Sequence, residues 1–85
     1  MRYRIVLKEE ASKQLDKLDK VISKRILSYL DNISINPEAY GKCLKHDFKG
    51  IRRYRVGKYR VLASLEKNEL KILVLKVGHR FRVYS

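Results

Sequence analysis

The first third of the chain changes from a two-residue hydrophobic repeat to a three-and-four-residue repeat. Over residues 2–7 apolar and polar side chains alternate, which predicts a strand that is buried on one face. Over residues 8–18, and again over 20–33, apolar side chains recur every three or four positions, which predicts two amphipathic helices. Because only Asp19 separates them, we expect an antiparallel helical hairpin with Asp19 as a cap or a break.

A proline and a glycine mark the boundaries that follow. Pro37 ends the second helix, since proline disfavours a helical conformation in the residue before it, and residues 40–50 are expected to form a loop. Gly57 separates two strand-like segments, residues 51–56 and 58–65, which predicts a tight turn within an antiparallel hairpin.

The last predicted strand is almost continuously apolar. It spans residues 70–77 and follows a turn at Lys67 and Asn68. An unbroken apolar run is typical of a central strand that is covered on both faces. The order strand, helix, helix, strand, strand, strand predicts a single α+β domain over residues 1–85. In this fold the helical hairpin covers one face of a small sheet, and the other face is concave and open.

The net charge indicates what kind of molecule this domain binds. The chain has 21 Lys and Arg residues against 9 Asp and Glu residues, a formal net charge of +12. Such a charge favours polyanionic partners: RNA, DNA, an anionic membrane or an acidic protein. A hydrophobic content of 45% favours a folded domain over a disordered basic tail. The alternative is a basic surface that serves solubility alone.

Cysteine and histidine usage excludes several classes of site. Cys43 is the only cysteine, so no intrachain disulfide or cysteine-based metal site is possible, and a reducing cytoplasm is the expected compartment. The apolar run near the N-terminus is too short for a signal peptide or a membrane span. His46 and His79 are isolated from carboxylate clusters, and we expect neither a metal nor a cofactor. Asp47 is interpreted as a loop cap.

Basic residues concentrate between positions 42 and 60, where Asp47 is the only acid. In a strand, Arg53 and Arg55 project from one face, while Tyr54 projects from the other and can pack on the helices. Arg60 joins the two arginines if the hairpin register allows it. Like charges side by side in a sheet repel, so this clustering favours a face that binds phosphates. A solvated basic face without a ligand is the alternative. The eight basic residues are Lys42, Lys45, Lys49, Arg52, Arg53, Arg55, Lys58 and Arg60.

Two residues near the C-terminus extend this site. Arg80 and Tyr84 follow the last predicted strand, and we expect them to close the other side of the cleft. Tyr84 offers either a ring on which an unpaired base can stack or a phenol that can transfer a proton. Paired carboxylates, a Ser-His-Asp arrangement and a glycine-rich phosphate loop are all missing from the sequence, which excludes glycosidase and nucleotide-hydrolase chemistry.

The same segments resemble toxins of the RelE/ParE superfamily. The stretch LKHDFKGIRRYRVGKYRVL (residues 44–62), followed by VGHRFRVY (77–84), carries the resemblance, and the preceding helical hairpin extends it over the whole chain. The most specific parts are the Gly-Lys-Tyr-Arg turn and the Gly-His-Arg-x-x-x-Tyr ending. The resemblance implies the toxin of a type II toxin–antitoxin pair, with a β-α-α-β-β-β fold.

In the RelE branch, the resemblance implies a ribosome-dependent mRNA endonuclease that cuts codons in the ribosomal A site. The 2′-hydroxyl attacks its neighbouring phosphate without a metal, so protein groups must move two protons and stabilise charge on phosphate. The implied partners are an acidic RelB-like antitoxin, the ribosome and mRNA. The free toxin is expected to be a monomer in the cytoplasm, with no membrane partner.

The resemblance assigns roles by position. Arg55, Arg60, Arg80 and Tyr84 match catalytic positions. Arg60 is expected at the reacting phosphate and Arg80 on the leaving-group side. The remaining basic residues are expected to hold RNA; they are Lys42, Lys45, Lys49, Arg52, Arg53, Lys58 and Arg82.

One departure from the RelE pattern concerns the general base. The best-known pattern has lysines at the two positions that Arg53 and Arg55 occupy here. An arginine side chain does not lose its proton at any accessible pH, so Arg55 can stabilise charge but is a poor base. The candidates are then Tyr84, His79 or no side chain at all. Two other functions stay open: a ParE-like inhibitor of DNA gyrase, and a non-catalytic RNA-binding relative.

Overall fold

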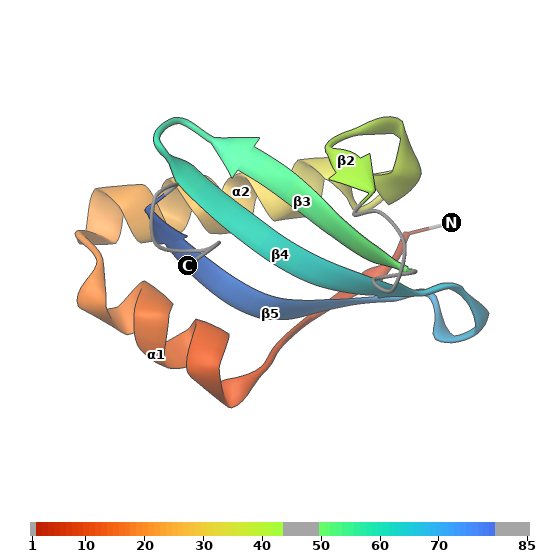
Figure 1. Ribbon diagram of the computed structural model, residues 1–85, viewed down its shortest axis with the longest axis horizontal. Helices are drawn as coiled ribbons and strands as arrows, with labels where there is room; N and C mark the ends of the chain where they lie inside the picture. The colour runs from red at the N-terminus through yellow and green to blue at the C-terminus, as the bar shows by residue number, and fades with distance from the viewer. Residues whose placement is uncertain (1, 44–49, 80–85) are drawn as a thin grey trace.

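The protein folds as an α+β domain in which two helices cover one face of a mixed sheet (Figure 1). The structure, a computed structural model, describes residues 2–43 and 50–79. Within these ranges the elements are β1 (Arg4–Leu7), α1 (Glu9–Lys17), α2 (Lys20–Ile33), a 3-10 helix (Pro37–Ala39), β2 (Lys42–Cys43), β3 (Ile51–Val56), β4 (Tyr59–Glu66), a second 3-10 helix (Lys67–Glu69) and β5 (Lys71–His79). The predicted fold class is confirmed.

The sheet has the order β1-β5-β4-β3-β2 in this part of the chain. Strands β3, β4 and β5 form the predicted antiparallel meander, and β1 pairs in parallel with β5. The predicted bounds of α2 and β3 match the structure, and those of the other predicted helix and strands are shifted by one or two residues. Strand β2 was not predicted, because a two-residue strand is too short to carry a periodic signal.

The hydrophobic core lies between the sheet and the two helices. Ala11 and Leu15 of α1, together with Ile26 and Leu30 of α2, are almost completely buried against the sheet. From the strands, the core includes Tyr54, Val56, Val61, Ala63, Leu65, Ile72, Val74 and Val77. Both helices use the apolar stripe that their three-and-four repeat predicts. We call the covered side of the sheet the inner face and the other side the outer face.

Within residues 2–43 and 50–79, strand β5 is fully buried on its inner face only, so the predicted cover on both faces is not found there. Ile72, Val74 and Val77 are buried, whereas Leu73 is only partly buried and lies opposite Val6 of β1 on the outer face. No element in the described part of the chain lies over the outer face (Figure 1).

A β-bulge explains why the apolar run of β5 looked continuous. Leu62 of β4 pairs with Lys76, but the next residue, Ala63, pairs with Val74. Leu75 is therefore an extra residue without a partner on β4, and the inward positions change from even to odd numbers beyond it. The bulge places an apolar residue where strict alternation would have required a polar one.

Turn and cap chemistry fixes the connections. The Asp19 carboxylate caps α2 by accepting a hydrogen bond from the Val21 backbone N–H at 3.0 Å. Gly57 and Lys58 form the two-residue connection between β3 and β4, and Gly57 has a φ of 61°. A positive φ at the first central residue is the requirement of a type II′ hairpin turn, which glycine meets without strain. The predicted cap and the predicted tight turn are both confirmed.

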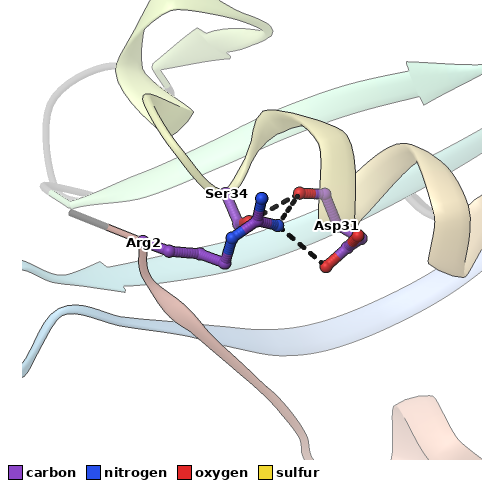
Figure 2. Close-up of polar contacts among 3 residues, drawn as sticks. All are labelled: Arg2, Asp31 and Ser34. Carbon is purple, nitrogen blue, oxygen red and sulfur yellow. Dashed lines mark hydrogen bonds and ion pairs between the residues drawn. The ribbon is translucent and has the colours of Figure 1, made fainter.

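A polar cluster joins the N-terminus to the end of α2 (Figure 2). The Arg2 guanidinium donates to the Asp31 backbone oxygen at 3.0 Å, to the Asp31 carboxylate at 3.1 Å and to the Ser34 hydroxyl oxygen at 3.1 Å. The buried Ser34 hydroxyl in turn donates to the Asp31 backbone oxygen at 2.6 Å. The only buried polar residue of the described core is therefore satisfied, and the Asp31 carboxylate already has a cationic partner.

None of the helices in residues 2–43 and 50–79 has the length and apolar character needed to span a membrane.

Candidate functional site

Four basic side chains form two directly opposed pairs at one end of the outer face. Lys42 of β2 lies opposite Arg53 of β3, and Arg55 of β3 lies opposite Arg60 of β4. Directly opposed side chains share a face and have Cβ atoms about 4.5–5.5 Å apart, so like charges there destabilise the sheet. Two such pairs side by side are therefore expected to be stabilised by a bound anion.

A pocket of about 320 Å³ lies among these cations. Its lining consists of Tyr29, Gly41, Lys42, Arg53, Arg55 and Arg60, without an acidic residue among the described residues. The volume is at the lower end of the range of about 300–1,000 Å³ that is typical of small-molecule sites. Because all four cations project from paired strands, their backbone positions are fixed before a ligand arrives. We call this pocket the basic pocket.

Gly41 allows the loop before β2 to lie directly against β3. Its φ is 67°, and a Cβ atom at this position would collide with the Arg53 carbonyl oxygen and the Tyr54 ring. Any side chain would push the loop away from the strand and Lys42 away from Arg53. The glycine is therefore part of what completes the basic pocket.

Arg52 faces away from the basic pocket and holds this loop in place. Its guanidinium donates to the Tyr40 carbonyl oxygen at 2.7 Å and 3.1 Å, to the Glu38 carbonyl oxygen at 3.2 Å and to the Gly41 carbonyl oxygen at 3.3 Å. The sequence analysis assigned Arg52 to RNA binding and missed this role. A signal was available, because Arg52 lies two residues before the buried Tyr54 and therefore points to the same, inner side of β3.

Tyr54 is a second anchor for the same loop. The side chain is completely buried, and its hydroxyl donates to the Pro37 carbonyl oxygen at 2.7 Å. Burial, the largest cause, raises the pKa of Tyr54 to about 12, so the phenol stays protonated and keeps donating. The Tyr29 ring packs edge-on against Tyr54 with 6.2 Å between the ring centroids.

Desolvation also affects Tyr29, which lines the basic pocket. Partial burial, followed by the neighbouring Tyr40, raises the pKa of Tyr29 above its usual value. Tyr29 therefore stays protonated at neutral pH. It can offer a hydroxyl donor and a ring face, but it is not suited to act as a base.

The end of β5 lies beside Arg60. Gly78 pairs with Arg60 across β4 and β5, and His79 pairs with Tyr59 with 6.0 Å between their ring centroids. Arg80 is the next residue in the sequence. Arg80 lies outside the described residues, as do the other predicted site residues Tyr84, Lys45, Lys49 and Arg82 and the candidate residues His46 and Asp47. Lys58 is exposed in the β3–β4 turn.

A family comparison identifies the class of protein to which this arrangement belongs. The model of the ParE toxin of type II toxin–antitoxin systems, parDE, matches residues 5–84. The chain belongs to this toxin family. No functionally curated protein matches the chain. The RelE/ParE resemblance that the sequence motifs indicated is therefore confirmed for nearly the whole length of this toxin.

Solved structures of similar proteins agree with this assignment. In the RelBE2 toxin–antitoxin complex from Mycobacterium tuberculosis, the matching chain is 26% identical with a TM-score of 0.85, and the match covers 94% of this toxin and 100% of that chain. The RelE–RelB complex from Pyrococcus horikoshii gives 28% identity and a TM-score of 0.77 over 96% and 99%. The intact Escherichia coli RelBE complex, at 18% identity with a TM-score of 0.76 over 91% and 95%, shares the fold.

The basic pocket of this toxin is suited to binding and stabilising phosphate. Arginine presents parallel N–H donors to phosphate and keeps its charge at every accessible pH. Among the described residues, no three His, Cys, Asp or Glu side chains come together as a metal site. The described part of the pocket offers charge stabilisation and hydrogen-bond donors to a bound phosphate.

Proposed function

We propose that this toxin is a ribosome-dependent endoribonuclease that cuts mRNA codons in the ribosomal A site. The observation that carries the proposal is the direct opposition of Arg55 and Arg60, beside Arg53 and Lys42, in a pocket without a described carboxylate. This arrangement suits a reaction in which negative charge accumulates on phosphate oxygens. The similarity to RelE toxins supports the same reaction.

The proposed reaction is an internal transfer. The 2′-oxygen of one nucleotide forms a bond to its adjacent phosphorus, and the bond from phosphorus to the 5′-oxygen of the next nucleotide breaks. One proton leaves the 2′-hydroxyl and one is added to the departing 5′-oxygen. The products are a 2′,3′-cyclic phosphate and a free 5′-hydroxyl, and no water or metal is consumed.

The pocket residues divide these tasks. Arg60 binds the reacting phosphate, and Arg55 stabilises the charge that grows on its oxygens. Arg80 acts on the leaving-group side, and Tyr84 stacks on a base or transfers a proton. His79, Tyr84 or electrostatic stabilisation without a base accounts for the first proton. Arg53, Lys42, Lys45, Lys49, Lys58 and Arg82 hold the flanking RNA, whereas Arg52, which was predicted to do so, instead holds the loop before Lys42.

An acidic, RelB-like antitoxin is the proposed protein partner, and the cytoplasm is the proposed site of action. The M. tuberculosis and P. horikoshii relatives were solved in toxin–antitoxin complexes. A net charge of +12 makes an acidic partner complementary to this toxin. We propose that the toxin is a monomer until the antitoxin binds.

Primer extension on mRNA in a purified translation system tests the proposal. The reactions contain or lack the toxin and contain or lack ribosomes. They are repeated with EDTA on preformed ribosome complexes that have been washed free of unbound magnesium and are kept intact with polyamine. We expect cuts inside codons only when ribosomes are present, with EDTA having no effect. Intact mRNA in a reaction where the antitoxin-free toxin is folded would contradict the proposal.

The second candidate function is inhibition of DNA gyrase, because the matching family model is that of ParE toxins. A gyrase inhibitor does not act on RNA and therefore does not need the opposed arginines. A supercoiling assay with purified gyrase separates the two functions. Inhibition of supercoiling together with intact mRNA would assign the toxin to the gyrase-directed class.

A further inference from the structure

A second hollow adjoins the basic pocket along the open edge of β3. It measures about 430 Å³ and lies between α2 and the end of β3. Tyr29 and Arg55 line both hollows, so the two form a continuous surface around the strand edge. Among the described residues, strand β2 pairs with Arg52 and Arg53 alone, so none of them pairs with the β3 edge at Arg55 and Val56.

One face of α2 supplies the wall of this second hollow. Arg25, Ser28, Tyr29 and Asn32 all line it, and their spacing of three, four and seven residues places them on the same side of the helix. This side is separate from the stripe formed by Ile26 and Leu30, which is buried in the core. The hollow therefore exposes a polar and aromatic helix face beside the core, to which only Tyr29 also contributes.

Two arginines give the hollow its charge. Arg25 lies against the β3–β4 turn, where a Cβ atom on Gly57 would be 3.5 Å from its nearest guanidinium nitrogen. In the described residues, neither Arg25 nor Arg55 forms a hydrogen bond or ion pair through its side chain. None of the described residues that line the hollow is acidic, and Asp31, which precedes Asn32, is paired with Arg2. The hollow is therefore suited to an anion.

Tyr29 adds a rigid aromatic surface next to these charges. Its edge contact with the buried Tyr54 restricts the ring, while the side chain is only partly buried. Asn32 adds an amide that can both donate and accept hydrogen bonds. An aromatic ring, an amide and two arginines are the groups that recognise a nucleotide in single-stranded RNA.

We propose that this second hollow binds a nucleotide of the RNA that neighbours the scissile phosphate, with the phosphate between Arg25 and Arg55 and the base against Tyr29. The inference rests on the proposed function, because the basic pocket must hold the reacting phosphate for the neighbouring nucleotide to reach α2. It extends the binding surface from the sheet to a helix to which the sequence pattern assigned no ligand.

The test asks whether removing the charge of Arg25 weakens the binding of a long RNA but not that of a short one. Fluorescence anisotropy measures the binding of non-cleavable 2′-O-methyl RNA, as a dinucleotide and as a hexanucleotide, to native toxin, Arg25→Gln and Lys24→Gln. Lys24 is the matched control because it is exposed on the same helix but lines neither hollow. Thermal unfolding establishes that all three proteins are folded.

We expect native toxin and Lys24→Gln to bind the hexanucleotide more tightly than the dinucleotide. Arg25→Gln should lose about tenfold in affinity for the hexanucleotide, as loss of one charge-assisted hydrogen bond implies, and nothing for the dinucleotide. For each protein, the logarithm of the binding constant is plotted against the logarithm of the salt concentration. The slope for Arg25→Gln should be shallower than the native slope by about 0.7, the value for one phosphate contact on a single strand.

A second variant tests the base contact. Tyr29→Leu keeps an apolar side chain against Tyr54 but removes the ring. Two hexanucleotides are compared, one with all its bases and one with a single abasic position. We expect the native toxin to bind the complete hexanucleotide more tightly, and Tyr29→Leu to bind both equally.

Different failures have different meanings. If the native toxin cuts mRNA on ribosomes but Arg25→Gln binds the hexanucleotide as well as Lys24→Gln does, the inference is wrong and the proposed function stands. If Arg25→Gln weakens binding of an aspartate hexapeptide but not of RNA, the hollow is a peptide site and the inference is also wrong. If the toxin neither cuts mRNA nor binds the hexanucleotide, both fail.

Discussion

The two faces of strand β3 separate stability from the proposed chemistry within six residues. On the inner face Tyr54 and Val56 are buried beneath the helices, whereas on the outer face Arg53 and Arg55 line the basic pocket. Adjacent residues point to opposite faces, so one strand supports the core and presents cations at the same time. The face of the sheet to which a residue of β3 points therefore indicates its role more reliably than its charge does.

Arg52 is the informative exception on this strand. It is as basic as its neighbour Arg53, but it points to the inner side and donates to three backbone carbonyl oxygens. Its charge is satisfied within the protein, while Arg55 on the other face has Arg60 opposite it. Two arginines three residues apart thus have different environments, and substitutions should affect different properties.

The largest expected effect on stability comes from the inner face. Ile72→Ala removes a completely buried side chain of β5 and should lower the free energy of unfolding by about 2–5 kcal/mol. Leu73→Ala, on the outer face of the same strand, is the matched control and should have a smaller effect because Leu73 is only partly buried. Urea unfolding measures both. Equal losses would mean that the two faces of β5 do not differ as described.

Arg52→Gln should have the next largest effect. Loss of its charged hydrogen bonds to the loop should lower the free energy of unfolding by about 1 kcal/mol, a value reduced from that of a buried group because the guanidinium is partly exposed. Since the loop positions Lys42, we expect a higher KM for ribosome-bound mRNA with little change in kcat. Arg52→Lys should restore only part of the affinity, because one ammonium cannot reach the same set of carbonyls. A drop in kcat with an unchanged KM would instead place Arg52 among the reacting groups.

Tyr54→Phe should remove about 1 kcal/mol of stability at neutral pH through the lost hydrogen bond to the Pro37 carbonyl. The hydroxyl pKa is about 12 in the folded protein and about 10 in an unfolded chain. Below pH 10 the phenol is protonated in both states. As the pH rises from 10 to 12 the unfolded chain loses its proton first, so the stability of the native protein falls.

The phenylalanine variant lacks this alkaline loss. The difference in unfolding free energy between native protein and variant should therefore shrink as the pH is raised from 9 to 12. Thermal unfolding at each pH measures this difference, which cancels the titration of the other tyrosines and the lysines. A constant difference across that range would show that the Tyr54 hydroxyl is not buried.

The sequence predicted the elements of this fold better than it predicted their contacts. The repeats located α2 and β3, and Gly57 located the turn. The bulge at Leu75 was not visible, because an extra apolar residue in a strand resembles a strand that is buried on both faces. The two-residue turn at Gly57 fixes the register that opposes Arg55 to Arg60, but the sequence reading began the next strand at Lys58 and left that register open.

The candidate site was predictable where residues are close in sequence. The clustering of Arg53, Arg55 and Arg60 was visible, whereas the contribution of α2 was not. Tyr29 falls within the three-and-four apolar repeat of residues 20–33, and a tyrosine at that spacing is usually part of a core. Only the three-dimensional packing shows that its ring also lines both hollows.

The smallest expected effect is that of the exposed ion pair in Figure 2. Asp31→Asn removes the charge that Arg2 contacts at 3.1 Å, but keeps an oxygen that can accept a hydrogen bond. Because both side chains are more than half exposed, the change in unfolding free energy should be below about 1 kcal/mol and smaller still at high salt. A loss above 2 kcal/mol in urea unfolding would indicate that this cluster is a major anchor of β1.

The central claim is that the basic pocket acts on RNA and that its activity is not a consequence of net charge. The most direct measurement is ribosome-dependent mRNA cleavage, followed by primer extension, for Arg55→Gln and Arg4→Gln. Arg4 lies opposite Lys71 on the outer face but outside the basic pocket, so both variants lose one charge from the same face. We predict that Arg55→Gln cuts about 10²–10³-fold more slowly, as loss of a charge-stabilising donor implies, whereas Arg4→Gln cuts at the native rate. Equal rates for the two folded variants would contradict the account.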